Sequence, residues 1–180
     1  MEKSNKVFIA CSLDGYIAGP EGEIDWLEMV PNPEGEDLGF GTFIAEVDAL
    51  LMGRATFELV SSFDGPWPYP CPVYVWSSKL AAIPEALADK AHLVKGSVSE
   101  VLARIHEQGH GRLYIDGGAT IQGFLREDLI DEMTLTTLPI LLGKGIPLFG
   151  ALEERQVFEL VSSEVGLGQL VQSHYRRKRG

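Results

Sequence analysis

Residues 49–62 read Ala-Leu-Leu-Met-Gly-Arg-Ala-Thr-Phe-Glu-Leu-Val-Ser-Ser, and their order decides the fold class. The apolar start predicts a short buried strand over Ala49–Met52. Gly53-Arg54 follows at once, and a helix is expected over Ala55–Ser62, because Asp64-Gly65-Pro66 then ends it. A strand that passes through a glycine directly into a helix is the repeating unit of parallel α/β sheets.

Similar units lie on both sides of this segment. The pattern predicts further strands over Lys6–Ser12, Val73–Trp76, His92–Lys95 and Leu113–Ile115. Helices are expected over Asp37–Val47 and Thr120–Asp128. A third helix is expected to begin at the capping box Ser97-Val98-Ser99-Glu100 and to end at Gly109. Strands without long helices between them follow, over Met133–Leu142, Phe158–Gly166 and Leu170–Arg176. We therefore expect a single three-layer α/β domain over residues 1–180, with a mainly parallel central sheet, antiparallel C-terminal strands and helices on both faces.

Composition excludes several classes of protein. The formal net charge is −11, whereas a general nucleic-acid binder needs a basic face; the basic run Arg176–Arg179 is expected to be a solvated tail. No apolar run approaches the ~20 residues of a membrane span, and the N-terminus has no signal-peptide pattern, so we expect a cytoplasmic protein. Cys11 and Cys71 lie in no metal-ligand pattern; no metal site is expected, and both are interpreted as apolar thiols.

Three predicted strand ends carry groups suited to phosphate. These are Gly53-Arg54, then Ser77-Ser78-Lys79, then Gly117-Gly118-Ala119-Thr120. They offer free N–H groups at helix starts, hydroxyls and cationic side chains, and the carboxyl ends of parallel strands meet at one edge of a sheet. A glycine at such a junction can also serve only to form a turn. Three such strand ends on one sheet, however, favour a binding site for a dinucleotide. The sequence lacks GxGxxG and GxxxxGK[ST], which disfavours an ordinary Rossmann dehydrogenase and a phosphotransferase.

Four segments, taken together, resemble the dihydrofolate reductase superfamily. They are Ile9–Gly19, Leu51–Glu58, Ser77-Ser78 and Ile115–Gly118. The chain is most similar in style to bacterial members related to the reductase domain of the riboflavin-pathway deaminase–reductase, a branch that Leu129–Leu135 and Pro139–Gly145 also resemble. The resemblance spans nearly the whole chain and implies a dihydrofolate reductase-like fold.

The resemblance also implies a function and a cofactor. It implies an NADPH-dependent reductase that transfers a hydride to a C=N or C=O bond, with Ala10 holding the nicotinamide carboxamide and Ile17 packing beside the ring. It assigns phosphate binding to Gly53, Arg54, Thr56, Ser77 and Ser78, with help from Lys79, and to the pair Gly117-Gly118, commonly joined by a cis peptide, with the helix start Ala119-Thr120-Ile121. Arg54 and the serines favour NADPH over NADH, because a 2′-phosphate needs donors.

The candidate residues for binding and protonating the substrate are mostly acidic. Asp37 is the candidate proton donor, because its spacing before Gly53 suits the acid of the family; the alternative is that Asp37 only interacts with the dipole of its helix. Asp25 and Glu36 are lesser candidates, and Trp26 is expected either to cover the pocket or to lie in the core.

Basic residues are missing from the expected substrate-facing segments. Between Lys6 and Arg54 there is no Lys or Arg against ten Asp and Glu, and residues 58–72 also contain none. These segments therefore offer no basic side chain to bind the carboxylates of the glutamate tail of folate or a ribose phosphate. We therefore expect a smaller, neutral or cationic heterocycle, with folate and the ribosylaminopyrimidine of riboflavin synthesis as fallback substrates.

Two further expectations concern partners. One alternative function is a catalytically idle NADP-binding regulatory or partner protein, which would keep the cofactor residues and lack the acid. A homodimer is also expected, with the apolar late strands, notably Thr134–Leu142, pairing or packing across a two-fold axis.

Overall fold

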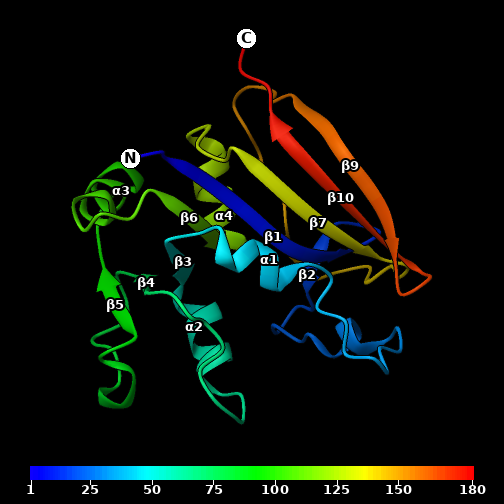
Figure 1. The fold of residues 1–180 in the computed structure, drawn as a ribbon, viewed down its shortest axis with the longest axis horizontal. Helices are drawn as coiled ribbons and strands as arrows, with labels where there is room; N and C mark the ends of the chain where they lie inside the picture. The colour runs from blue at the N-terminus through cyan, green and yellow to red at the C-terminus, as the bar shows by residue number, and fades with distance from the viewer.

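An eight-stranded sheet runs through the computed structural model, which describes residues 1–180 (Figure 1). The strands are β1 (Ser4–Ser12), β3 (Ala49–Gly53), β4 (Val73–Trp76), β5 (Ala91–Val94), β6 (Arg112–Asp116), β7 (Glu132–Leu138), β9 (Phe158–Gly166) and β10 (Leu170–Arg177). Their order is β5-β4-β3-β6-β1-β7-β10-β9. The pairs from β5 to β7 are parallel, and β10 and β9 are antiparallel additions beyond β7. The predicted α/β architecture is confirmed.

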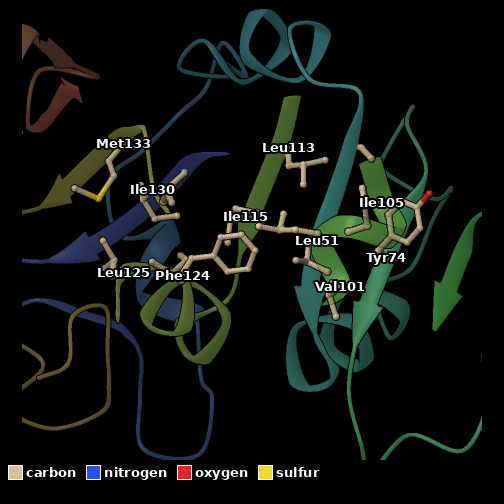
Figure 2. Close-up of a cluster of buried hydrophobic side chains, with 14 of the residues drawn as sticks. Leu51, Tyr74, Val101, Ile105, Leu113, Ile115, Phe124, Leu125, Ile130 and Met133 are labelled. Atoms are coloured by element: carbon tan, nitrogen blue, oxygen red, sulfur yellow. The ribbon is translucent and has the colours of Figure 1, made fainter. Parts of the chain in front are cut away.

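Helices cover both faces of the sheet. α3 (Val98–Glu107) and α4 (Gly118–Arg126) pack on one face, where Figure 2 shows Ile105 and Phe124 in one cluster with Leu51 and Ile115. α1 (Phe40–Ala45) and α2 (Arg54–Ser61) pack on the other face, in a cluster that contains Phe43, Phe57, Leu50 and Met52. Neighbouring residues of β3 thus enter opposite cores, which is why this strand is a continuous apolar run. None of the helices is long and apolar enough to span a bilayer.

A second, two-stranded sheet ties two loops together at the carboxyl end of β1. It pairs β2 (Tyr16–Ala18) with β8 (Ile146–Pro147), both too short for sequence periodicity to reveal. The Asp14 carboxylate reinforces the pairing, because it accepts hydrogen bonds from the Ser12 hydroxyl (2.6 Å) and the Gly143 N–H (2.8 Å). Two short 3-10 helices, η1 (Asp25–Glu28) and η2 (Glu85–Leu87), lie in the remaining loops.

Three sequence expectations need correction. The helix expected over Asp37–Val47 is only α1, because Leu38 and Gly39 take φ values of 52° and 85°, which an α-helix does not admit. The strand expected over Met133–Leu142 ends at Leu138, because Pro139 has no N–H for the ladder. The basic run is not a solvated tail, since Arg177 pairs with Asp128 and Arg179 with Asp131, each at 2.6 Å. The capping box at Ser97 is confirmed.

Candidate active site

A cavity of about 680 Å³ lies where β3 and β6 end and α2 and α4 begin. Ligand pockets typically have volumes of about 300–1,000 Å³. Of the residues that the sequence assigns to a cofactor, the cavity is lined by Ile17, Gly53, Arg54, Thr56, Gly117, Gly118, Ala119 and Thr120. Segments from distant parts of the chain thus meet at the carboxyl edge of the parallel strands, the usual ligand position in such sheets.

The N-termini of α2 and α4 both face this cavity without a side-chain cap. The first N–H groups of a helix have no partner inside the helix and are normally satisfied by caps, water or ligands. By contrast, α3 begins with a capping box, in which the Ser97 hydroxyl accepts from the Glu100 N–H and the Glu100 carboxylate accepts from the Ser97 N–H. The two uncapped helix starts therefore provide backbone donors and positive dipole ends for anionic groups.

Gly117 allows these two helix starts to approach each other. Its φ is +91°, and a Cβ at this position would lie 2.6 Å from Thr56 Oγ1. A Cβ on Gly53 would likewise lie 3.2 Å from Thr120 Oγ1. The cis peptide implied for Gly117-Gly118 is not present, since the chain has none; the positive φ of Gly117 turns a trans chain from β6 into α4.

The β2–β8 sheet closes one side of the cavity with apolar groups. A Cβ on Gly118 would lie 2.9 Å from Ile17 Cδ1 and 3.3 Å from Ile146 Cγ2. Glycine at this position therefore lets the two isoleucines reach the backbone of the α4 start. The result is an apolar wall beside the uncapped N–H groups.

Asp116, which the sequence analysis passed over, is an acid in the cavity lining. Its Oδ1 accepts a hydrogen bond from the Gly117 N–H at 2.8 Å. Burial raises the pKa of Asp116 to about 6, although the Gly117 N–H acts in the opposite direction. The available signal was its position: it directly follows the predicted strand Leu113–Ile115 and precedes the glycine pair.

The remaining charges of the cavity are mostly negative. Arg54 is the one basic residue in the lining, against Glu21, Glu58 and Asp116. Trp76, the last residue of β4, also lines the cavity, and its Nε1–H donates to the Gly96 carbonyl at 3.0 Å. Like Asp116, Trp76 and the two glutamates were not among the sequence-predicted site residues.

Several predicted residues lie outside the cavity lining. Ala10 and Trp26 pack in a small apolar cluster beside Leu138, Ile121 is fully buried in the α3–α4 core, and Asp25, Glu36, Ser78 and Lys79 are exposed. The Ser77 hydroxyl accepts the N–H groups of Lys79 and Leu80, at 3.1 and 3.0 Å. In this structure Ser77 therefore stabilises the turn after β4.

Asp37 is exposed and lies outside the cavity lining as well. Its carboxylate accepts hydrogen bonds from the N–H groups of Gly39 (2.9 Å) and Gly41 (2.8 Å) at the start of α1. These contacts, the Gly41 N–H first, lower the pKa of Asp37. The geometry corresponds to the helix-start alternative, since an exposed carboxylate with a lowered pKa is a poor proton donor near neutral pH.

Comparison with known proteins identifies relatives of the whole chain. A family model described as the RibD C-terminal domain matches residues 6–171. A crystal structure from Shewanella sp. PV-4, described provisionally as a riboflavin biosynthesis protein, is 52% identical, with a TM-score of 0.94 over 98% of this chain and 99% of that one. The protein YwjB of Bacillus subtilis is 36% identical over 98% of this chain and 99% of its own length. The dihydrofolate reductase of Enterococcus faecalis, solved with NADP(H), shares the fold with a TM-score of 0.66 at 19% identity, over 98% of this chain and 97% of that one.

Proposed function

This chain belongs to the RibD C-terminal domain family, and from that premise we propose that it is an NADPH-dependent reductase of a small heterocyclic substrate. The observation that carries the proposal is the meeting of two uncapped helix starts, Arg54 and a half-buried acid, Asp116, in one cavity of dinucleotide size. The use of NADP(H) by a protein of the same fold, the dihydrofolate reductase of Enterococcus faecalis, supports the choice of cofactor.

The residues of the cavity fit a nicotinamide dinucleotide phosphate. The starts of α2 and α4 supply backbone donors for a pyrophosphate, and Arg54 supplies a guanidinium for a further phosphate. Gly117 keeps the two starts close enough to act together, and Ile17 and Ile146 provide an apolar surface suited to a nicotinamide ring. When bound, NADPH would supply the hydride.

Asp116 is proposed to hold the proton that the reduction consumes. Reduction of a C=N or C=O bond leaves a nitrogen or oxygen that takes up one proton. With a pKa of about 6, the carboxyl of Asp116 remains protonated in part of the molecules near neutral pH, whereas the lowered pKa of Asp37 keeps that side chain ionised. Asp116 therefore takes the role that the sequence analysis gave to Asp37. An acid in the cavity lining is what distinguishes this proposal from the idle-protein alternative, in which the acid is missing.

The charge of the cavity favours a neutral or cationic heterocycle as substrate. In this proposal Arg54 binds a phosphate of the cofactor. No second basic residue lines the cavity to bind a phosphate or carboxylate of the substrate. Glu21 and Glu58 instead favour positive charge. The ribosylaminopyrimidine of riboflavin synthesis and folate remain the fallback substrates.

The cofactor proposal is tested by thermal shift with NADPH and NADH. NADPH is expected to raise the melting temperature of the wild-type protein more than NADH at equal concentration. In Arg54→Ala the difference between the two should disappear, with NADPH binding weakened about 10-fold or more, because a charge-assisted hydrogen bond contributes about 1.5–3 kcal/mol. Arg126→Ala, at the exposed end of α4, is the control. Equal stabilisation of the wild-type protein by NADPH and NADH would contradict the choice of NADPH.

Among the late strands, β9 rather than β7 offers a free edge for the proposed homodimer. β7 already pairs with β1 and β10 and has no free edge, whereas β9 is the last strand of the sheet (Figure 1). Val165 of β9 lies opposite Val171 of β10, and Leu160 opposite Tyr175, so exposed apolar side chains lie on one face on either side of the Ser163–Ser173 pair. We propose that a second copy packs there.

Val165→Lys should yield a monomer in light scattering, because it places a charge on the proposed contact face. The exposed Leu141→Lys, which lies outside β9, should leave the dimer intact. A monomeric wild-type protein would refute the dimer.

A further inference from the structure

The one cation in the cavity lining is bound by a carboxylate one helical turn away. Arg54 is the first residue of α2, and its Nη1 donates to both carboxylate oxygens of Glu58, at 3.0 and 3.1 Å. Both side chains line the cavity and remain 44% and 49% exposed, so both can contact a ligand.

The pair is poorly explained as a device that stabilises the helix. A cation in the first turn opposes the helix dipole, and the order with Arg before Glu is the less favourable one for an i,i+4 pair. Exposed pairs of this kind also contribute little to stability. Both side chains line the cavity, however, so the guanidinium of Arg54 and the carboxylate of Glu58 can each attract or repel a bound ligand directly.

The two groups have opposite effects on the two nicotinamide dinucleotides. A 2′-phosphate needs the guanidinium of Arg54, but the Glu58 carboxylate already accepts from one nitrogen of that guanidinium and repels the phosphate. A free ribose 2′-hydroxyl, as in NADH, can donate to a carboxylate instead. The balance between the groups therefore determines how strongly the site distinguishes NADPH from NADH.

We propose that Glu58 is the residue that sets cofactor selection, and that by holding Arg54 it narrows the preference for NADPH so that NADH is also accepted. This inference rests on the proposed function, namely that the cavity binds a nicotinamide dinucleotide. It concerns the ratio of the two dissociation constants and not whether binding occurs.

The test is calorimetric titration of NADPH and NADH into Glu58→Gln and the wild-type protein. The variant keeps the shape of the side chain and removes its charge. We expect NADPH to bind about three- to tenfold more tightly than in the wild type, because a negative charge beside Arg54, the residue that would hold the phosphate, is lost, while NADH binds equally or less tightly. The melting temperature without ligand should change by no more than about 2 °C, since the exposed pair contributes little to stability.

The matched control is Glu21→Gln, which removes the same charge from the same cavity at a residue without a bond to Arg54. It should change the affinities for NADPH and NADH together and leave their ratio unaltered. An unchanged ratio in Glu58→Gln, or an equal rise in both variants, would overturn the role of Glu58 and leave the reductase proposal intact. Failure of the wild-type protein to bind either dinucleotide would instead overturn the proposed function itself.

Discussion

Replacing Asp116 by Asn is expected to lower kcat by about 10²- to 10⁴-fold, the usual contribution of a positioned general acid. The wild-type rate should be highest below about pH 6 and should fall as pH rises through the pKa of Asp116, because only the protonated carboxyl donates. The variant should lose this dependence. The measurement is NADPH oxidation with a panel of neutral and cationic heterocycles, from about pH 4.5 to about pH 8.5, which covers both sides of that pKa.

The matched control for this change is Asp37→Asn, since Asp37 is the acid that the sequence favoured. It should retain kcat and lose at most about 1 kcal/mol of stability, the usual effect of weakening a helix cap. If Asp37→Asn abolished turnover while Asp116→Asn did not, the assignment of the proton donor would be wrong.

The raised pKa of Asp116 can also be tested without a substrate, through the stability of the protein. Its pKa is raised by burial, so its ionisation disfavours the folded state; its contribution to stability is present below about pH 4 and is lost as pH rises through about 6. Asp116→Asn, which cannot ionise, is therefore expected to melt at a higher temperature than the wild type at pH 8. At pH 4 the two should melt at similar temperatures. Equal melting temperatures at both pH values would show that the pKa of this carboxyl is not raised in the folded state.

Gly117→Ala should reduce NADPH affinity by about 10-fold or more, because it strains the backbone donors at the start of α4 and displaces a side chain of α2 at once. The added Cβ would lie 2.6 Å from Thr56 Oγ1, so the Thr56 side chain must shift. A non-glycine residue at φ +91° also costs about 1–2 kcal/mol of stability. Calorimetric titration with NADPH and thermal melting measure the two effects separately.

Gly168→Ala is the matched control, since Gly168 has a φ of +72° with open space around it, in the turn between β9 and β10. It should lose a comparable amount of stability and bind NADPH as the wild type does. Wild-type affinity in Gly117→Ala would mean that the ligand does not use these helix starts.

Much of the fold could be predicted because local patterns were strong. The apolar run before Gly53, the capping box at Ser97 and the turn residues of the C-terminal strands each define an element without help from tertiary contacts. The limits of α1 could not be predicted, because Leu38 has no sequence signal for a positive φ. β2 and β8 are stabilised by Asp14 and by each other across the chain, which local periodicity cannot show.

The candidate site was predictable where backbone geometry alone defines it. Glycines at strand–helix junctions located the two helix starts, whereas the protonation of Asp116 depends on burial, which a sequence does not display. Asp37 was favoured by spacing, but its carboxylate is used by the N–H groups of Gly39 and Gly41. A side chain that can cap its own helix needs a structure to decide whether it faces solvent or a cavity.

The most direct test of the dinucleotide site is a titration of the ¹⁵N-labelled protein with NADPH, followed by amide chemical shifts. Saturable shifts are predicted at the starts of α2 and α4, in particular at Arg54, Ala55, Gly118 and Ala119, with little change in β9 and β10. Absence of saturable shifts at about 1 mM NADPH, the upper end of the usual KM range, or shifts confined to other surfaces, would contradict the account.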